Sequence, residues 1–408
     1  MTDAPSANPT PQDIVLDQDG PREPPRSYVR RVLGDTLARW GARLGVAWIS
    51  ILAALSVLAP FLASSHPIAL KTTDGIWSSP LLRHLTAADV TLLVVAATAL
   101  TLWFTGSWSI GRRVLVFLGI LAVTIGLTLA LVQPPSPIVY SQYRELEDAG
   151  KVEFILRAPI PYSPTDRLRD RSQPPVQGPS SEHWCGTEAN GADVLSRMIH
   201  ASRIAMAVGF IATGIAALIG ILIGGVMGYF SGLVDLIGMR LVEIAESIPT
   251  LFLLLMFVAF FDRNLYMMMV IIGFTTWSGY ARFIRAEFLK LRQQDFVLAG
   301  VACGLPLRSI LFRHMLPNGL APVLVSASFG VASAILYEAV LSFLGLGLVD
   351  EPSWGEMLNQ ATGAAGTFSW WLATFPGMAI FLTVFAYNLI GESLRDAIDP
   401  HLKKSSHL

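Results

Sequence analysis

Residues 204–234 read "IAMAVGFIATGIAALIGILIGGVMGYFSGLV" and contain no Asp, Glu, Lys or Arg. A second stretch, residues 357–391, also lacks these four residue types. A helix needs about 20 predominantly apolar residues to cross the hydrocarbon core of a bilayer, so both stretches are long enough. Of all 408 residues, 53% are hydrophobic and only 14% are charged, which is unusual for a soluble globular chain. The composition therefore predicts an all-α, polytopic membrane protein.

Apolar runs of helical length recur along the chain and predict about eight transmembrane helices. We expect them near residues 45–63, 88–105, 114–132, 205–229, 247–261, 265–281, 318–346 and 371–391. The fifth run is short and can extend back to Leu241, which would place Glu243 and Glu246 one turn apart near the membrane surface. The predicted organisation is three N-terminal spans at 44–132, an outer loop at 133–203 and a core at 204–395.

The positions of Lys and Arg predict the orientation, because positive residues in short loops stay on the cytoplasmic side. With the N-terminus inside, eight crossings place Arg112, Arg240, the segment from Arg282 to Arg313, and Arg395 inside as well. The loop at 133–203 is also basic but falls outside, and loops longer than about 60 residues cross largely regardless of charge. Both termini are therefore expected to be cytoplasmic. Six prolines among the first 27 residues predict disorder in the tail at 1–43, and a second tail follows at 396–408.

The outer loop contains one predicted strand and one predicted helix entry. The segment "KVEFILR", residues 151–157, alternates in the manner of a short strand. Thr187 and Asn190 are candidate N-caps for an amphipathic helix that leads into the next span. A further set of residues has side chains that can bind metals, but its spacing matches no familiar ligand pattern, so we expect no metal site: His183, Cys185, Asp193 and His200.

Small residues in the fourth span predict close helix packing. Gly220, Gly224 and Gly228 follow one another at intervals of four and so lie on one helix face. In lipid, such small-xxx-small faces let two helix backbones approach closely. The pattern indicates tight packing and says nothing about a substrate.

The sequence offers little chemistry of its own. Glu338 is the candidate for an ionisable group within a span, and it could line a pathway or reach the outer interface. No phosphate-binding loop of the Gly-x-x-x-x-Gly-Lys-Ser/Thr type is present, and no catalytic pairing of Ser with His is evident. We expect no catalytic residue, metal or cofactor. Nucleic-acid binding has no support either, because the basic residues lie beside membrane spans.

One long cytoplasmic loop, residues 282–317, looks suited to contact a partner. Residues 283–291 and 295–302 are predicted helices, Gly304 can stop the second one in a left-handed conformation, and Pro317 suits the first turn of the next span. Phe296, Val297 and Val301 are the side chains expected to face the partner, and Arg308 and Arg313 hold the loop on the cytoplasmic side.

A series of motifs carries a family resemblance. "LAGVACG" and "ILFRHMLPN" have the spacing of the Glu-Ala-Ala loop of ATP-binding-cassette importer permeases. Three further motifs occur in the order seen in C-type permeases of dipeptide and oligopeptide importers: "GYFSGLVDLIGMRLVEI", "EAVLSFLGLGL" and "PSWGEML". Residues 183–400 thus resemble that family, and the long proline-rich outer loop is similar to that of the microcin-C type importers.

The resemblance implies a type I importer permease fold for the core and an ATPase-coupling role for the loop. Leu298, Ala299 and Gly300 occupy the Glu-Ala-Ala positions, although the family usually has Glu and Ala where Leu298 and Gly300 stand. The residues implied in coupling are Phe296, Leu298, Ala299, Gly300, Gly304, Arg313, His314, Leu316 and Pro317. The implied partners are a homologous B-type permease, two ATPase subunits and an external solute-binding protein, all at a bacterial inner membrane.

The implied function is passage of di- and oligopeptides, driven by ATP hydrolysis in the partner. Two other classes remain open. An ion-coupled secondary carrier would need buried ionisable groups or helices broken at mid-membrane. A scaffold that transports nothing would show the same hydropathy. Measurement of peptide flux with and without ATP separates the three.

Overall fold

The computed structural model describes residues 28–104, 108–132, 135, 139–168, 176–261, 264–348, 351–363 and 368–398, so most of both expected tails lies outside the described residues. The N-terminal half contains α1 Tyr28–Ala38, α2 Trp40–Leu62, β1 Ala69–Thr72, β2 Trp77–Ser78, α3 Pro80–Arg83, α4 Ala87–Phe104, α5 Ile110–Leu131, α6 Gln142–Asp148 and β3 Val152–Leu156. The C-terminal half contains α7 Val194–Phe230, α8 Gly232–Ser247, α9 Thr250–Phe260, α10 Leu265–Thr275, α11 Trp277–Leu291, α12 Asp295–Ala302, α13 Leu307–Ser309, η1 Ile310–Met315, α14 Leu316–Phe343, α15 Trp354–Ala361 and α16 Trp370–Ile398.

Helices occupy all eight stretches in which a span was expected, but not all of them are long enough to cross a bilayer alone. Five helical stretches in the described chain satisfy length and hydropathy: α2, α5, α7, α16 and the continuous stretch Leu307–Phe343. The helices α8 and α9 count as a sixth span if the pair, bent by 79°, is taken together. The remaining two, α4 and α10, are shorter apolar helices. The polytopic helical fold is confirmed, while the structure gives five or six full spans.

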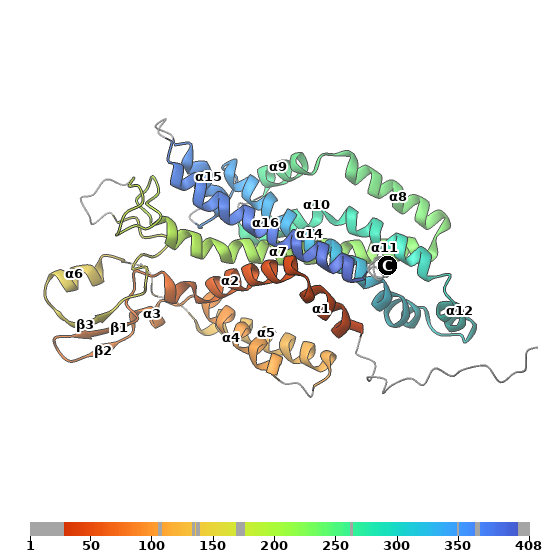
Figure 1. Cartoon of the computed structure of the whole chain (residues 1–408), viewed down its shortest axis with the longest axis horizontal. Coiled ribbons are helices and arrows are strands. Elements are labelled where there is room, and N and C mark those ends of the chain that lie inside the picture. Colours follow the sequence, from red (N-terminus) through yellow and green to blue (C-terminus); the bar gives the residue numbers. More distant parts are fainter. Residues whose placement is uncertain are drawn as a thin grey trace, which may run out of the picture.

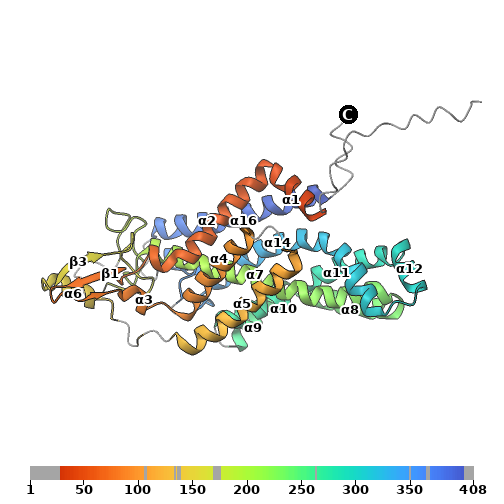
Figure 2. The same cartoon turned by 90° about the horizontal axis from the view of Figure 1, so that it is seen from below.

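Helix α7 is the centre of the bundle. It packs against α2, α10, α11 and α14 and runs through the middle of the molecule (Figures 1 and 2). The outer sheet and α6 lie at one end of the long axis, and α12 lies at the other (Figure 1). The start of α1 and the end of α16 lie toward the α12 end, where Arg39 pairs with Asp396.

The predicted glycine face of α7 forms its contact with α11. A Cβ atom at Gly224 would lie 2.3 Å from the carbonyl oxygen of Ala281, and one at Gly220 would lie 2.4 Å from Cβ of Tyr280. A Cβ at Gly228 would lie 2.6 Å from Cβ of Phe288. Because real Cβ atoms cannot approach that closely, only glycine permits this backbone contact.

The hairpin formed by α4 and α5 is fixed to α7 by a charged contact. Arg203 of α7 donates a hydrogen bond from Nε to the carbonyl oxygen of Ser56 at 2.5 Å, and it also pairs with Asp89 near the start of α4. Within the hairpin, the hydroxyl groups of Thr91 and Thr128 lie 3.0 Å apart. One arginine therefore joins α2, α4 and α7.

The outer region is assembled from two separate stretches of chain. The sheet order is β2–β1–β3, with both pairs antiparallel. The expected strand in "KVEFILR" is confirmed as β3, and its partner β1 lies between the first two spans, where no strand was expected. The pairing of distant segments explains why sequence periodicity did not reveal β1.

The residue that caps the N-terminus of α7 differs from the two candidates predicted from the sequence. Neither Thr187 nor Asn190 caps the helix: Asp193 does, by accepting a hydrogen bond from the backbone N–H of Ser196 at 2.8 Å. The other carboxylate oxygen of Asp193 lies 2.8 Å from Nδ1 of the fully buried His183. Thr187 and Asn190 instead accept bonds from the backbone of Gln177 and Ala192 within the loop.

A buried ionic cluster joins this outer loop to α7 and α15. Nε of Arg197 lies 2.5 Å from Oε1 of Glu188, and its Nη2 lies 2.7 Å from Oε2 of Glu356. The single guanidinium thus faces two carboxylates, and the side chain of Glu188 is fully buried. Burial, with a smaller repulsion from Glu356, raises the pKa of Glu188 to about 7 although Arg197 opposes the shift.

The glycine contact predicts a position-specific effect of alanine. Gly224→Ala should destabilise the protein by about 1–3 kcal/mol, because the new methyl group meets the α11 backbone. Gly214→Ala on the same helix is the matched control, because nothing lies within 4 Å of its Cβ position. Thermal unfolding of both purified variants measures the difference. Equal unfolding temperatures would contradict the assigned contact.

The cluster at Glu188 predicts a dependence of stability on pH. The pKa of Glu188 in the folded protein lies above its ordinary value of 4.5. The free energy of unfolding that its protonated form contributes is therefore fully present below about pH 4.5 and is lost as the pH rises through about 7. Glu188→Gln keeps an uncharged group and should flatten this decline in unfolding temperature. The exposed neighbour Glu182→Gln should leave it unchanged. A Glu188→Gln profile that follows the wild type would refute the assignment.

Candidate functional site

The loop between α11 and α14 folds into the predicted helix, turn and helix. α12 covers Asp295–Ala302, as expected. Gly304 lies just beyond its end and has a φ of +70°. The backbone N–H of Leu305 donates to the carbonyl of Gly300 at 3.0 Å, and that of Gly304 donates to Val301 at 3.0 Å. This pair of bonds is the Schellman motif, which requires a left-handed residue at the glycine position. The predicted role of Gly304 in the turn is confirmed.

α12 has one buried side and one exposed side. Val297 is 2% exposed and packs with Ile310 and Met315, so the expectation that it faces a partner is wrong. Phe296, Leu298 and Val301 are 42%, 54% and 52% exposed. Ala299 is exposed too, and Gly304 lies at the exposed turn. The free face of α12 is therefore apolar.

Gly300 lies on the buried side of α12. A Cβ atom there would lie 3.3 Å from Cδ1 of Leu305. The contact is with the flexible end of a side chain, which can shift by a few tenths of an ångström, so this contact does not require glycine.

The chain re-enters the bundle through a π-helical turn. η1, residues Ile310–Met315, precedes α14 without a break, so the continuous helical stretch begins at Leu307 rather than at Pro317. Pro317 nevertheless lies in the first turn of α14, where it was expected. Of the remaining predicted coupling residues, Arg313 is exposed, and His314 and Leu316 are partly exposed.

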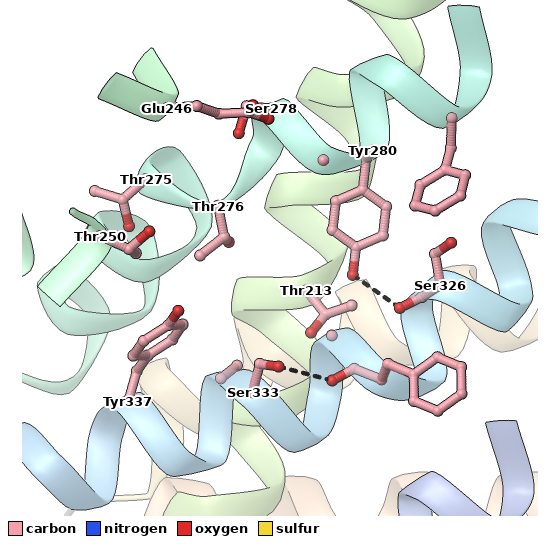
Figure 3. Close-up of a pocket in the computed structure, with 15 residues that line it drawn as sticks. Thr213, Glu246, Thr250, Thr275, Thr276, Ser278, Tyr280, Ser326, Ser333 and Tyr337 are labelled. Atoms are coloured by element: carbon pink, nitrogen blue, oxygen red, sulfur yellow. Dashed lines mark hydrogen bonds between the residues drawn. The ribbon is translucent and has the colours of Figure 1, made fainter. Parts of the chain in front are cut away.

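A cavity lies between α7, α9, α10, α11 and α14, with the end of α8 at its edge (Figure 3). It offers about 370 Å³ to water-sized molecules. Nine of the fifteen residues that line it carry a hydroxyl group: Thr213, Thr250, Thr275, Thr276, Ser278, Tyr280, Ser326, Ser333 and Tyr337. The hydroxyl of Tyr280 donates to the carbonyl of Ser326 at 3.4 Å. Such a wall can hydrogen-bond a polar solute without selecting for charge.

Two breaks between consecutive helices provide part of this wall. The bend between α8 and α9 places Glu246 and Thr250 on the cavity, and the junction of α10 with α11 contributes Thr275 and Thr276. Irregular backbone within a membrane protein is tolerated where it lines a cavity. The sequence analysis did not identify either break. Pro249, directly before α9, was the available signal for the first one.

Glu246 is the one carboxylate among the fifteen residues that line the cavity, and it pairs with Arg282. Glu338, the candidate suggested by the sequence, is absent from this lining. It is 2% exposed and accepts hydrogen bonds from Ser342 at 2.7 Å and Ser353 at 2.8 Å. The structure thus gives Glu338 the local role of joining α14 to the residue before α15.

The described residues contain no group of three or more His, Cys, Asp or Glu side chains arranged to hold a metal ion. His183 and Asp193 pair with each other, whereas Nε2 of His200 lies 3.0 Å from the carbonyl oxygen of Ala63. The two cysteines are both free.

Known proteins similar to this chain are membrane transport components. Residues 220–404 match the family described as "Binding-protein-dependent transport system inner membrane component". The oligopeptide transport system permease protein OppC of Haemophilus influenzae is 39% identical over 244 residues, which cover 59% of this chain and 77% of the relative. The dipeptide transport system permease protein DppC of Bacillus subtilis is 36% identical over 227 residues, which cover 55% of this chain and 71% of the relative.

Two further comparisons concern an inner membrane permease and a solved structure. The inner membrane ABC transporter permease protein YejE of Escherichia coli is 36% identical over 261 residues, which cover 63% of this chain and 74% of the relative. A chain of the inward-facing MetNI methionine ABC transporter superposes with a TM-score of 0.42 at 16% identity, covering 50% of this chain and 97% of that one.

These similarities define a class of protein, the membrane-embedded permeases of ATP-binding-cassette importers. The chain belongs to the family of binding-protein-dependent transport system inner membrane components. It is a multi-pass permease subunit, and the ATPase of such an importer is a separate subunit. The family match begins at Gly220, so α2, the hairpin α4–α5 and the outer sheet precede the matched segment.

The turn at Gly304 predicts a selective loss of coupling. Gly304→Val should lower ATPase association and transport, because a β-branched residue at a positive φ costs roughly 1–2 kcal/mol and disfavours the turn that orients α12. Gly304→Asn is the matched control, because asparagine tolerates the left-handed conformation. Co-purification of the ATPase with each variant provides the measurement. Normal ATPase association in Gly304→Val would contradict a docking role for this loop.

Proposed function

We propose that this chain is one of two homologous permeases in an ATP-driven importer of di- and oligopeptides. Relatives named as oligopeptide and dipeptide permeases support the cargo class. The cavity supports it as well, because hydroxyl groups can hydrogen-bond a peptide backbone irrespective of its side chains. The cavity would form one half of the pathway, and a B-type permease would supply the other half.

The observation that carries the proposal is the exposed apolar face of α12. The side chains of Phe296, Leu298 and Val301 are exposed on α12. This short helix lies at the end of the molecule opposite the outer sheet (Figure 1). A solvent-exposed apolar helix face of this kind suits a hydrophobic groove on a partner. Each of two permeases would dock on one of two ATPase subunits through this surface.

The coupling surface that we propose includes the residues expected from the sequence, with two changes. Phe296, Leu298 and Ala299 provide direct contacts, and Gly304 fixes the turn. Gly300 acts through its packing against Leu305, whereas Val297 holds α12 onto the bundle. Arg313, His314, Leu316 and Pro317 lie on the return path and would hold the loop at the cytoplasmic surface.

The orientation that we propose follows from this docking. Both described ends of the chain lie toward the α12 end, so the N- and C-termini would be cytoplasmic in a bacterial inner membrane (Figure 1). The outer sheet and the ionic cluster around Arg197 would then face the other compartment. An external solute-binding protein would deliver peptide there.

The bend between α8 and α9 gives some support to a second candidate, an ion-coupled carrier, because such carriers use broken helices. Glu246 at this bend is already paired with Arg282, however, and it is the one carboxylate in the cavity. This arrangement lacks the chain of free ionisable groups that proton transfer through the membrane would use.

Uptake by the reconstituted complex tests the proposal. Proteoliposomes that contain this chain, the second permease, both ATPases and the binding protein should accumulate labelled di- and oligopeptides only when ATP is supplied. The control complex carries an ATPase unable to hydrolyse ATP and should show background uptake. Accumulation driven by an ion gradient without ATP would support the secondary carrier, and no accumulation under either condition would exclude peptide transport.

A further inference from the structure

Helix α11 connects the cavity to the coupling loop. Its first turn contributes Ser278 and Tyr280 to the cavity wall, and three residues separate its end at Leu291 from the start of α12. Phe288 of α11 and Val297 of α12 lie in the same buried cluster. Because closely packed side chains transmit displacement, a movement of α12 also moves α11.

Helix α8 has little apolar packing against the rest of the bundle. Val242 is its one buried residue, and it packs in a small cluster with Met227, Trp277 and Ala281. Leu233 and Ile237 are 76% and 69% exposed. Apolar packing alone therefore gives α11 a limited hold on α8.

Two ion pairs supply a second connection between these helices. Asp235, in the first turn of α8, binds Arg285 through both carboxylate oxygens: Oδ2 lies 2.7 Å from Nη2, and Oδ1 pairs with Nε. Glu246, in the last turn of α8, pairs with Arg282. The two arginines are three residues apart on α11, so one face of α11 holds both ends of α8.

Asp235–Arg285 is less exposed than the other two ion pairs of α8, and the side chains of Arg282 and Glu246 are 52% and 33% exposed. Exposed fractions are 26% for the Arg285 side chain and 16% for that of Asp235. The pair Arg240–Glu243 lies within α8 itself and is 69% and 48% exposed. Shielding from water strengthens an ion pair and makes the loss of one partner costly, so Asp235–Arg285 is the stronger contact.

The bend at residues 247–249 gives α8 freedom to move. It follows directly after Glu246, and the chain turns by 79° before α9 begins at Thr250. Glu246 and Thr250 both line the cavity, so a rotation of α8 about this bend changes the cavity wall (Figure 3). A short connecting segment between two helices is the usual place for a hinge.

We propose that Asp235, Arg285, Glu246 and Arg282 are positioning residues that make α8 follow α11 when the ATPase displaces α12. The movement bends the chain at residues 247–249 and opens or closes the cavity. This inference rests on the proposed function for its transport readout. Its mechanical part concerns the movement of helices within this chain and can be measured in the full complex without any substrate.

Charge reversal in the reconstituted complex tests the inference through the ratio of peptide transported to ATP hydrolysed. Arg285→Asp should lower this ratio at least about tenfold, because the energetic coupling between the two helices is lost. The double variant Asp235→Arg with Arg285→Asp restores opposite charges and should recover the ratio to within about threefold. The swap Arg240→Glu with Glu243→Arg is the matched control and should leave the ratio unchanged.

Two results overturn the inference: an unchanged ratio in Arg285→Asp, or a double variant that assembles and remains uncoupled. If Arg285→Asp fails to assemble, the milder Asp235→Asn decides the question. It keeps the shape of the side chain and removes its charge, so a lowered ratio supports the inference and an unchanged ratio overturns it.

A distance measurement separates this inference from the proposed function. Spin labels are placed at Leu241→Cys on α8 and Phe385→Cys on α16, both about half exposed, with Cys185 and Cys303 replaced by serine. Nucleotide trapping of the full complex should change the distance in the parent chain, leave it unchanged in Arg285→Asp and change it again in the charge swap. Peptide uptake can fail while this pattern holds, and the pattern can fail while uptake persists. A nucleotide-dependent change that survives in Arg285→Asp overturns the inference.

Discussion

The close approach of α7 and α11 is the contact on which the rest of the structure depends. Gly220, Gly224 and Gly228 let the α11 backbone lie directly against α7, at separations that leave no room for a side chain. In a membrane, where lipid is as apolar as a helix surface, shape fit of this kind supplies much of the packing energy. α10, α14 and α2 then pack on the remaining faces of α7. The position of α11 determines in turn where the cavity and the proposed coupling loop lie.

The two ends of the molecule are built on different physical principles. At the outer end, Arg197 and Arg203 each join several segments through buried or partly buried charges. Such contacts are rigid, because separating them leaves an uncompensated charge away from water. At the other end, α12 is held mainly by Val297 and by a backbone turn at Gly304. A lightly attached helix on a firmly packed α11 suits a part that receives force and passes it on.

The cavity lies between these two ends, at the bend between α8 and α9 and the junction of α10 with α11. Its wall is rich in hydroxyl groups and contains one carboxylate, Glu246. Polar groups that carry no net charge tolerate many solutes, so in the importer that we propose, selectivity would reside in the delivery of the substrate and in the second permease rather than in this wall. The bend beside Glu246 joins the wall to the mechanical path that we propose through α11.

Much of this organisation followed from the sequence itself. Charge-free apolar runs located the helices, the spacing of Gly220, Gly224 and Gly228 predicted a packed face, and Gly304 predicted the turn after α12, because each depends on neighbours close in the chain. Tertiary structure alone decided which side of α12 is buried and that Glu246 rather than Glu338 lines the cavity. The sequence also could not predict that Asp235 pairs with Arg285 or that Arg203 pairs with Asp89. Those outcomes depend on contacts between residues distant in the chain, and local periodicity carries no information about which distant segment will supply the partner.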